Sequence, residues 1–155
     1  MLSDLFLVDT SAWIFALRKD FLPVIKNRVE YLLKENAIFT TGMVKLELLG
    51  GTKSENEFQR LKSRMNALDS VECDAALWEE ASKLAFDLRR KGITVPYTDI
   101  LVASCALKIS ATLVHSDAHF DLIHQHSELK VESFVKQVNK SDQFRLNIDP
   151  ATKKS

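Results

Sequence analysis

Four acidic residues stand where an apolar run ends or within a segment expected to be helical. They are Asp9, Glu47, Asp99 and Asp117. Carboxylates that are far apart in a sequence can meet at one edge of a parallel sheet, because ligand sites form beyond the carboxyl ends of its strands. Oxygen ligands of this kind suit a hard divalent cation such as Mg²⁺. The four residues therefore predict a metal site.

The segments that would position these acids alternate between strand and helix. Apolar runs predict strands at residues 5–8, 37–41, 112–116 and 130–134. Capping residues and three- or four-residue apolar spacing predict a helix after Asp9 and further helices at 22–34, 43–49, 55–68, 75–91 and 99–108. Trp78 is expected in the core, and Thr98 is expected to cap the helix of Asp99. The alternation predicts an α/β protein whose parallel sheet is covered on both faces.

The composition fits one folded unit. The chain has 155 residues, of which 46% are hydrophobic, and this is enough apolar material for one core. We place the domain at residues 1–135 and regard 136–155 as a polar C-terminal extension that is partly mobile. No run is long enough to cross a membrane and no export signal is recognised, so we expect a cytoplasmic protein. Cys73 and Cys105 lack CxxC spacing and are expected to be buried free thiols.

Basic residues are concentrated in two short stretches although the net charge is zero. A formal charge of zero argues against a strongly basic nucleic-acid binder. Residues 53–64 and 89–91 are nonetheless rich in lysine and arginine, and either stretch would suit a phosphate backbone. The simpler interpretation is that both are ordinary solvated helix faces.

Four short motifs occur along the chain, each after the element expected to present it. They are Asp9-Thr10-Ser11, Lys45-Leu46-Glu47, Thr98-Asp99-Ile100-Leu101-Val102-Ala103, and Ser116-Asp117 with Phe120. Together and in this order they resemble the PIN domain family, and within it the VapC-type toxin ribonucleases most of all. The resemblance extends from Asp9 to about Phe134.

The resemblance implies a fold, an activity and partners. The fold is a PIN-like three-layer α/β/α arrangement, and the activity is that of a Mg²⁺- or Mn²⁺-dependent endoribonuclease. The partners are an RNA substrate, a small antitoxin that inserts a segment into the acidic pocket, and a second copy of the chain held through helices. The implied catalytic and metal-binding residues are Asp9, Glu47, Asp99 and Asp117, with hydroxyl support from Thr10, Ser11 or Thr98. Lys53, Arg60, Arg64 and His119 are expected to contact substrate.

One position departs from the family pattern. The family commonly has a second acidic residue shortly before the aromatic that corresponds to Phe120, whereas this chain has His119 there. Asp117 either holds the fourth acidic position alone or is assisted by Asp121.

The chemistry of clustered carboxylates agrees with that implication. Neighbouring carboxylates repel one another and are driven toward protonation unless a cation is bound. A bound divalent ion lowers the pKa of a water for attack on a phosphodiester, so no nucleophilic side chain is required. The expected products carry 5′-phosphate and 3′-hydroxyl ends.

Other interpretations compete with this one. Taken singly, the acids could be helix caps, a turn residue or half of a buried ion pair. A metal-dependent phosphatase or receiver-like domain would also place aspartates at strand ends, although no DxDx[TV] motif follows the first strand. A non-catalytic interaction module is the third candidate. Four histidines lie close together in the sequence and could be considered for a zinc site: His115, His119, His124 and His126. The end of a predicted strand divides the first two, so they would not share one helix face. The default interpretation is that all four are surface histidines.

Overall fold

A computed structural model describes residues 4–18 and 22–140 and shows one five-stranded sheet. The strands are β1 (Phe6–Val8), β2 (Ile38–Thr41), β3 (Asp69–Val71), β4 (Thr112–His115) and β5 (Lys130–Ser133). They are all parallel and lie in the order β3-β2-β1-β4-β5. The predicted α/β class with a covered parallel sheet is therefore confirmed.

The paired middle residues of the two central strands β1 and β4 are apolar and buried, as expected where both faces of the sheet are covered. In β1, Leu7 and Val8 are fully buried, and their partners Leu113 and Val114 in β4 are fully buried as well. Four strands follow the predicted runs within one or two residues. The edge strand β3 was not predicted, since only Val71 of its three residues is buried.

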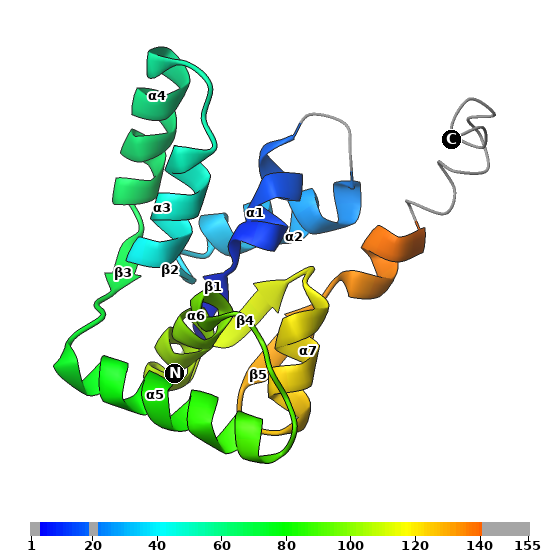
Figure 1. The fold of residues 1–155 in the computed structure, drawn as a ribbon. Coiled ribbons are helices and arrows are strands. Elements are labelled where there is room, and N and C mark those ends of the chain that lie inside the picture. The colour runs from blue at the N-terminus through cyan, green and yellow to red at the C-terminus, as the bar shows by residue number, and fades with distance from the viewer. Residues whose placement is uncertain (1–3, 19–21, 141–155) are drawn as a thin grey trace, which may run out of the picture.

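Helices connect every pair of consecutive strands (Figure 1). They are α1 (Thr10–Leu17), α2 (Pro23–Lys34), α3 (Gly42–Gly50), α4 (Glu55–Asn66), α5 (Ala75–Arg90), α6 (Tyr97–Lys108) and α7 (Ala118–Gln125). The side chains of Asp9, Thr41, Ser54, Asp74 and Asp117 accept a hydrogen bond at an N-terminus, as capping residues do. Helix α7 was not predicted, although it has a capping aspartate and buries Phe120 and Ile123.

Helix α6 lies at the centre of the helical packing. Every residue from Ile100 to Ala106 is buried, and the helix contacts α5, α3 and α7. Helix α5 covers it with Leu77, Ala81 and Leu88 but leaves Trp78 55% exposed. The expectation that Trp78 lies in the core is wrong, because the buried stripe of α5 passes one position away from it.

The two cysteines lie close together beside α6. Cys105 is buried, Cys73 is half-buried, and their sulfur atoms are 3.8 Å apart as free thiols. Burial and the neighbouring Cys73 raise the pKa of Cys105 to about 12. Free thiols agree with the prediction, while the burial of Cys73 is only partial.

The described chain continues beyond β5 as a helix over residues 135–140, and Val138 packs against the core. The predicted polar extension thus begins within this helix, and residues 141–155 lie outside the described residues. Within the described ranges, none of the helices combines the length and apolar character required to cross a membrane.

Candidate active site

Two neighbouring central strands place two of the predicted acids at the same edge of the sheet. Strands β1 and β4 run side by side, and the amide of Asp9 donates to the carbonyl of Val114 at 2.9 Å. The segment after β4 is tied to α1, because Ser116 donates to the Ser11 hydroxyl at 3.0 Å and to the Ser11 carbonyl at 2.8 Å. The chain is therefore held in place where it turns toward Asp117.

Asp9 is a buried carboxylate at the N-terminus of α1. Its Oδ2 accepts from the amide of Ser11 at 2.9 Å, and the residue is 5% exposed. Burial raises the pKa of Asp9 above its usual value, and the charge of Glu47 adds to the rise, while the hydrogen bonds from Ser11 and Thr10 oppose it. Asp9 thus caps α1 and also lies near enough to Glu47 and Asp99 for their charges to repel.

Glu47 reaches the same region from α3. The hydroxyl of Thr41 caps this helix by accepting from the amide of Val44, and Glu47 lies on its exposed side. Its Oε1 accepts from the hydroxyl of Thr10 at 3.1 Å. Among the residues expected to give hydroxyl support, Thr10 therefore contacts Glu47.

Asp99 lies in the first turn of α6, where the buried residues that follow it fix its position. The helix begins at Tyr97 with Pro96 as its N-cap residue and no side-chain cap. Thr98 already has helical backbone, so the expectation that it caps the helix is wrong. Desolvation by burial raises the pKa of Asp99 to about 7, with further contributions from the charges of Asp117 and Asp9.

Asp117 and His119 complete this side of the site. Asp117 caps α7 by accepting from the amide of His119 at 2.9 Å. His119 Nδ1 lies 3.0 Å from Asp117 Oδ1 and 3.2 Å from Asp99 Oδ2. The position that departs from the family pattern therefore faces the carboxylates, and one ligand atom from each of these three residues lies within 4.8 Å of the others.

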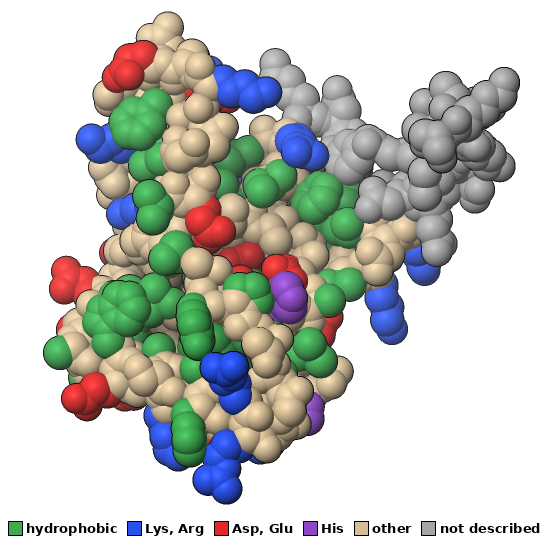
Figure 2. Space-filling model, viewed as in Figure 1, with side chains coloured by type: hydrophobic (Ala, Val, Ile, Leu, Met, Phe, Trp, Pro, Cys, Tyr) green, Lys and Arg blue, Asp and Glu red, His purple; other side chains and the backbone are tan. Residues whose placement is uncertain are grey.

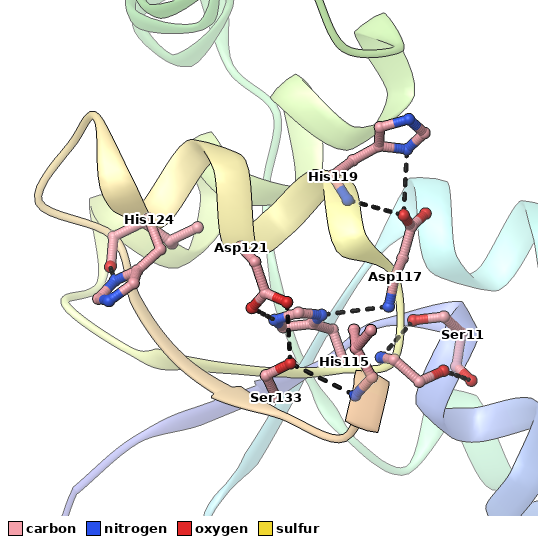
Figure 3. A network of polar contacts seen from close by, with 10 residues as sticks. Ser11, His115, Asp117, His119, Asp121, His124 and Ser133 are labelled. Carbon is pink, nitrogen blue, oxygen red and sulfur yellow. Dashed lines mark hydrogen bonds and ion pairs between the residues drawn. The ribbon is translucent and has the colours of Figure 1, made fainter. Parts of the chain in front are cut away.

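Asp121 belongs to a different group of side chains. Its Oδ2 accepts from the hydroxyl of Ser133 at 3.1 Å, and its Oδ1 lies 3.3 Å from His115 Nε2 (Figure 3). Asp121 thus points toward β4 and β5, away from His119. In the described structure the carboxylate that accompanies Asp99 is that of Asp117.

His115 lies beside the site, where the sequence predicted only a surface histidine. It is fully buried, and its Nδ1 accepts from the backbone amide of Asp117 at 3.2 Å. Desolvation lowers the pKa of His115, although nearby carboxylates oppose the shift. An accepting Nδ1 places the proton of the neutral ring on Nε2, toward Asp121. The only signal in the sequence was its place at the end of an apolar strand.

The four histidines do not share one site. His115 faces Asp121, His119 faces the acidic cluster, His124 Nδ1 lies 2.6 Å from the carbonyl of Leu129, and His126 ends α7. The default interpretation as surface histidines is wrong for His115. Tertiary contacts bury the end of β4, where His115 lies, and the sequence does not reveal them.

The remaining predicted residues lie around this cluster. The Ser11 hydroxyl accepts from the amide of Ser116, so it holds the adjoining loop. Thr98 is exposed beside Asp99. Lys53 precedes α4, Arg60 and Arg64 lie on it, and all three are exposed.

The donor set fits a divalent cation. Carboxylate oxygens and one imidazole nitrogen lie within 4.8 Å of one another, and His119 Nδ1 is buried without a hydrogen bond. Asp9 and Asp117 cap helices and Asp99 lies in a first turn, so three helix N-termini stabilise negative charge here. Figure 2 shows acidic side chains and a histidine in the middle of one face, between the α3–α4 pair and the α5–α6 pair.

Comparison with known proteins agrees with these features. The model of the PIN domain family matches residues 6–124. Ribonuclease VapC11 of Mycobacterium tuberculosis is 33% identical over 132 residues, which cover 83% of this chain and 98% of that protein. Ribonuclease VapC51 of the same organism is 29% identical and covers 76% of this chain and 84% of its own length.

Solved structures share the fold. VapBC2 from Rickettsia felis bound to a promoter DNA fragment has a TM-score of 0.69 at 24% identity. The match covers 84% of this chain and 98% of that chain. DNA-bound VapBC from Salmonella typhimurium has a TM-score of 0.69 at 19% identity with the same coverage. The match of the family model and the identity with VapC11 show that this chain belongs to the PIN domain family.

Proposed function

We propose that the chain is a Mg²⁺- or Mn²⁺-dependent endoribonuclease and the toxin of a toxin–antitoxin pair. The observation that carries the proposal is the group of carboxylates beyond β1 and β4, where Asp99 and Asp117 offer ligand atoms together with His119. Asp9 and Glu47 lie near enough to raise the pKa of Asp99 by repulsion. Curated relatives named as VapC ribonucleases support the same activity.

Asp99 and Asp117 would hold the ion, with Asp9 and Glu47 as the further acidic ligands. Bound there, a divalent cation supplies a water of lowered pKa and neutralises charge on the leaving oxygen of a phosphodiester. The raised pKa of Asp99 means that its carboxyl must lose a proton before it can act as a ligand near neutral pH.

Residues outside the ligand set keep it in place. The Thr10 hydroxyl orients Glu47, and the amide of Ser11 orients Asp9. The buried ring of His115 accepts from the amide of Asp117 and so fixes the start of α7. These contacts hold the carboxylates in positions from which they could bind a cation.

The partners in this proposal are an RNA, an antitoxin and a second copy of the chain. VapBC-5 of Mycobacterium tuberculosis, a solved neighbour, belongs to the VapBC family of toxin–antitoxin systems, and this likeness supports a small antitoxin as the partner of this chain. The basic side chains on and before α4 are the candidate contacts for the RNA backbone. An RNA substrate and an antitoxin would both be met in the cytoplasm, so the proposal places the protein there.

Cleavage of labelled structured RNA tests the proposal. The wild-type protein should cut internally with Mg²⁺ or Mn²⁺ and not with chelator, leaving 5′-phosphate ends. Asp9→Asn and Asp99→Asn should lose at least about 100-fold of the rate, since each removes a charged group from the metal site. The exposed Asp69→Asn in β3 is the matched control and should cleave normally.

Two outcomes would contradict the proposal. Equal cleavage by wild type and both site variants would remove the assignment of these carboxylates. Release of phosphate from a small ester with the RNA left intact would favour the phosphatase interpretation. Asp121→Asn adds a finer test, because its carboxylate engages Ser133 and His115 and should be needed less than that of Asp117.

A further inference from the structure

The ring of His119 lies against the carboxylates of both Asp99 and Asp117 in the candidate metal site. Nδ1 lies 3.0 Å from Asp117 Oδ1 and 3.2 Å from Asp99 Oδ2. The side chain reaches the site from the first turn of α7, where Asp117 itself caps the helix (Figure 3). Both residues are therefore positioned by the same helix start.

The environment of Nδ1 suits a metal ligand better than a hydrogen-bond donor. The atom is buried, and although two carboxylate oxygens lie near it, neither is placed to accept a hydrogen bond from it. A buried polar atom without a partner is unusual and calls for one. A cation between the three ligand atoms would supply that partner to the nitrogen and to both oxygens.

The separations also fit a coordination shell. Ligand atoms at right angles around an ion with bonds of about 2.1 Å lie about 3 Å apart. The measured separations of 3.0 and 3.2 Å from Nδ1 agree with such neighbouring positions. A neutral ring with its proton on Nε2 would direct the Nδ1 lone pair to the ion.

We propose that His119 binds the metal through Nδ1 and that this nitrogen makes the site prefer Mn²⁺ to Mg²⁺. Mg²⁺ takes oxygen ligands, whereas an imidazole nitrogen is a ligand of first-row transition ions. An acidic residue at this position would give an all-oxygen site. The inference rests on the proposed metal site of the ribonuclease and adds the choice of ion.

A different role for His119 is an internal counter-ion. A protonated ring between Asp99 and Asp117 would neutralise them in place of the metal. The two roles predict opposite effects of removing the ring. Loss of a ligand weakens Mn²⁺ binding more than Mg²⁺ binding, whereas loss of a competing cation strengthens binding of both ions.

Titration calorimetry with Mn²⁺ and with Mg²⁺ on the metal-free protein separates these roles. For His119→Ala the ratio of Mn²⁺ to Mg²⁺ affinity should fall at least about tenfold. His119→Asp should lower the same ratio while Mg²⁺ affinity is kept or increased. His126→Ala, an exposed histidine at the end of α7, is the matched control and should keep the wild-type ratio.

Pulsed electron paramagnetic resonance of the Mn²⁺-loaded protein gives an independent readout. Modulation from a ligand ¹⁴N should be present in wild type and His126→Ala and absent in His119→Ala. An unchanged affinity ratio, tighter binding of both ions by His119→Ala, no ¹⁴N signal, or no Mn²⁺ binding at all would each overturn the inference. Nitrogen-coupled Mn²⁺ without RNA cleavage would contradict the proposed function alone. Cleavage without nitrogen coupling would contradict this inference alone.

Discussion

The fold disfavours ionisation of the Asp99 carboxyl when no cation is bound. Its pKa is raised from 3.8 to about 7, first by desolvation and then by the charges of Asp117 and Asp9. Between these two values the folded protein holds a proton that the unfolded chain has released. The free energy of unfolding therefore falls as pH rises through this window, and the deficit is complete above pH 7.

Replacing Asp99 by asparagine should remove this loss of free energy of unfolding in the metal-free protein. We expect Asp99→Asn to raise the free energy of unfolding at pH 8 by about 1–2 kcal/mol, a value reduced for the partial exposure of the carboxyl. The difference should shrink toward zero near pH 4. Urea unfolding with chelator at both pH values measures it, and the exposed Asp69→Asn serves as the control variant. A variant that is less stable than wild type at pH 8 would contradict the prediction.

Residues that directly follow strands were easier to place from the sequence than those inside the next helix. Asp9 and Asp117 could be assigned to one sheet edge because parallel strands end there together. The contacts of His115 and His119 could not be assigned, since the direction of both side chains depends on where α7 begins. The hydroxyl of Thr10 was expected near the site, but its partner Glu47 is reached only through the packing of α3 beside α1.

At the level of elements, α4 is the best candidate for contact with RNA. Arg60 and Arg64 lie one turn apart on this helix and are exposed, so they present charge on the same side. Lys53 adds a third cation just before its N-terminus. Such a row of cations would contact phosphates without reading base sequence.

Removal of the two arginines should weaken RNA binding and its dependence on salt. For Arg60→Ala/Arg64→Ala we expect the slope of log affinity against log salt to fall by about 0.7 for each phosphate that the variant no longer neutralises. Fluorescence anisotropy in an Asp99→Asn background, where RNA should stay intact, measures the slope across KCl concentrations. The paired control is Arg89→Ala/Arg90→Ala at the end of α5. If that pair lowers the slope and the α4 pair does not, the RNA backbone binds at α5.

The elements that the sequence did not reveal are the short ones. β3 is three residues long, contains two exposed polar residues, and exists because β2 offers it an unpaired edge. Helix α7 follows a strand by only two residues, and its apolar positions overlap the histidine-rich stretch. Longer helices such as α5 can be predicted from their own apolar periodicity. The residues of α5 that become buried, however, depend on how the helix packs against α6.

At the scale of the whole molecule, the part of the chain that the structure describes leaves an apolar face exposed along α5 and α6. Two adjoining hollows of about 390 and 550 Å³ lie there, and Trp78, Phe86 and Tyr97 are 55, 52 and 70% exposed beside them. Figure 2 shows apolar side chains gathered over this part of the chain. Contiguous exposed apolar surface of this kind marks protein contacts, and we propose that it is where a second copy binds.

Charge placed on this face should separate the proposed dimer. Trp78 and Phe86 lie two turns apart on α5, so Trp78→Glu/Phe86→Glu buries two carboxylates in any interface formed there. Sedimentation equilibrium should show a dimer for wild type and a dimer dissociation constant at least about 100-fold higher for the variant. Val24→Glu changes a residue that is 46% exposed on α2 and should remain dimeric. A wild-type monomer at tens of micromolar, or a variant that stays dimeric while Val24→Glu dissociates, would move the interface away from α5.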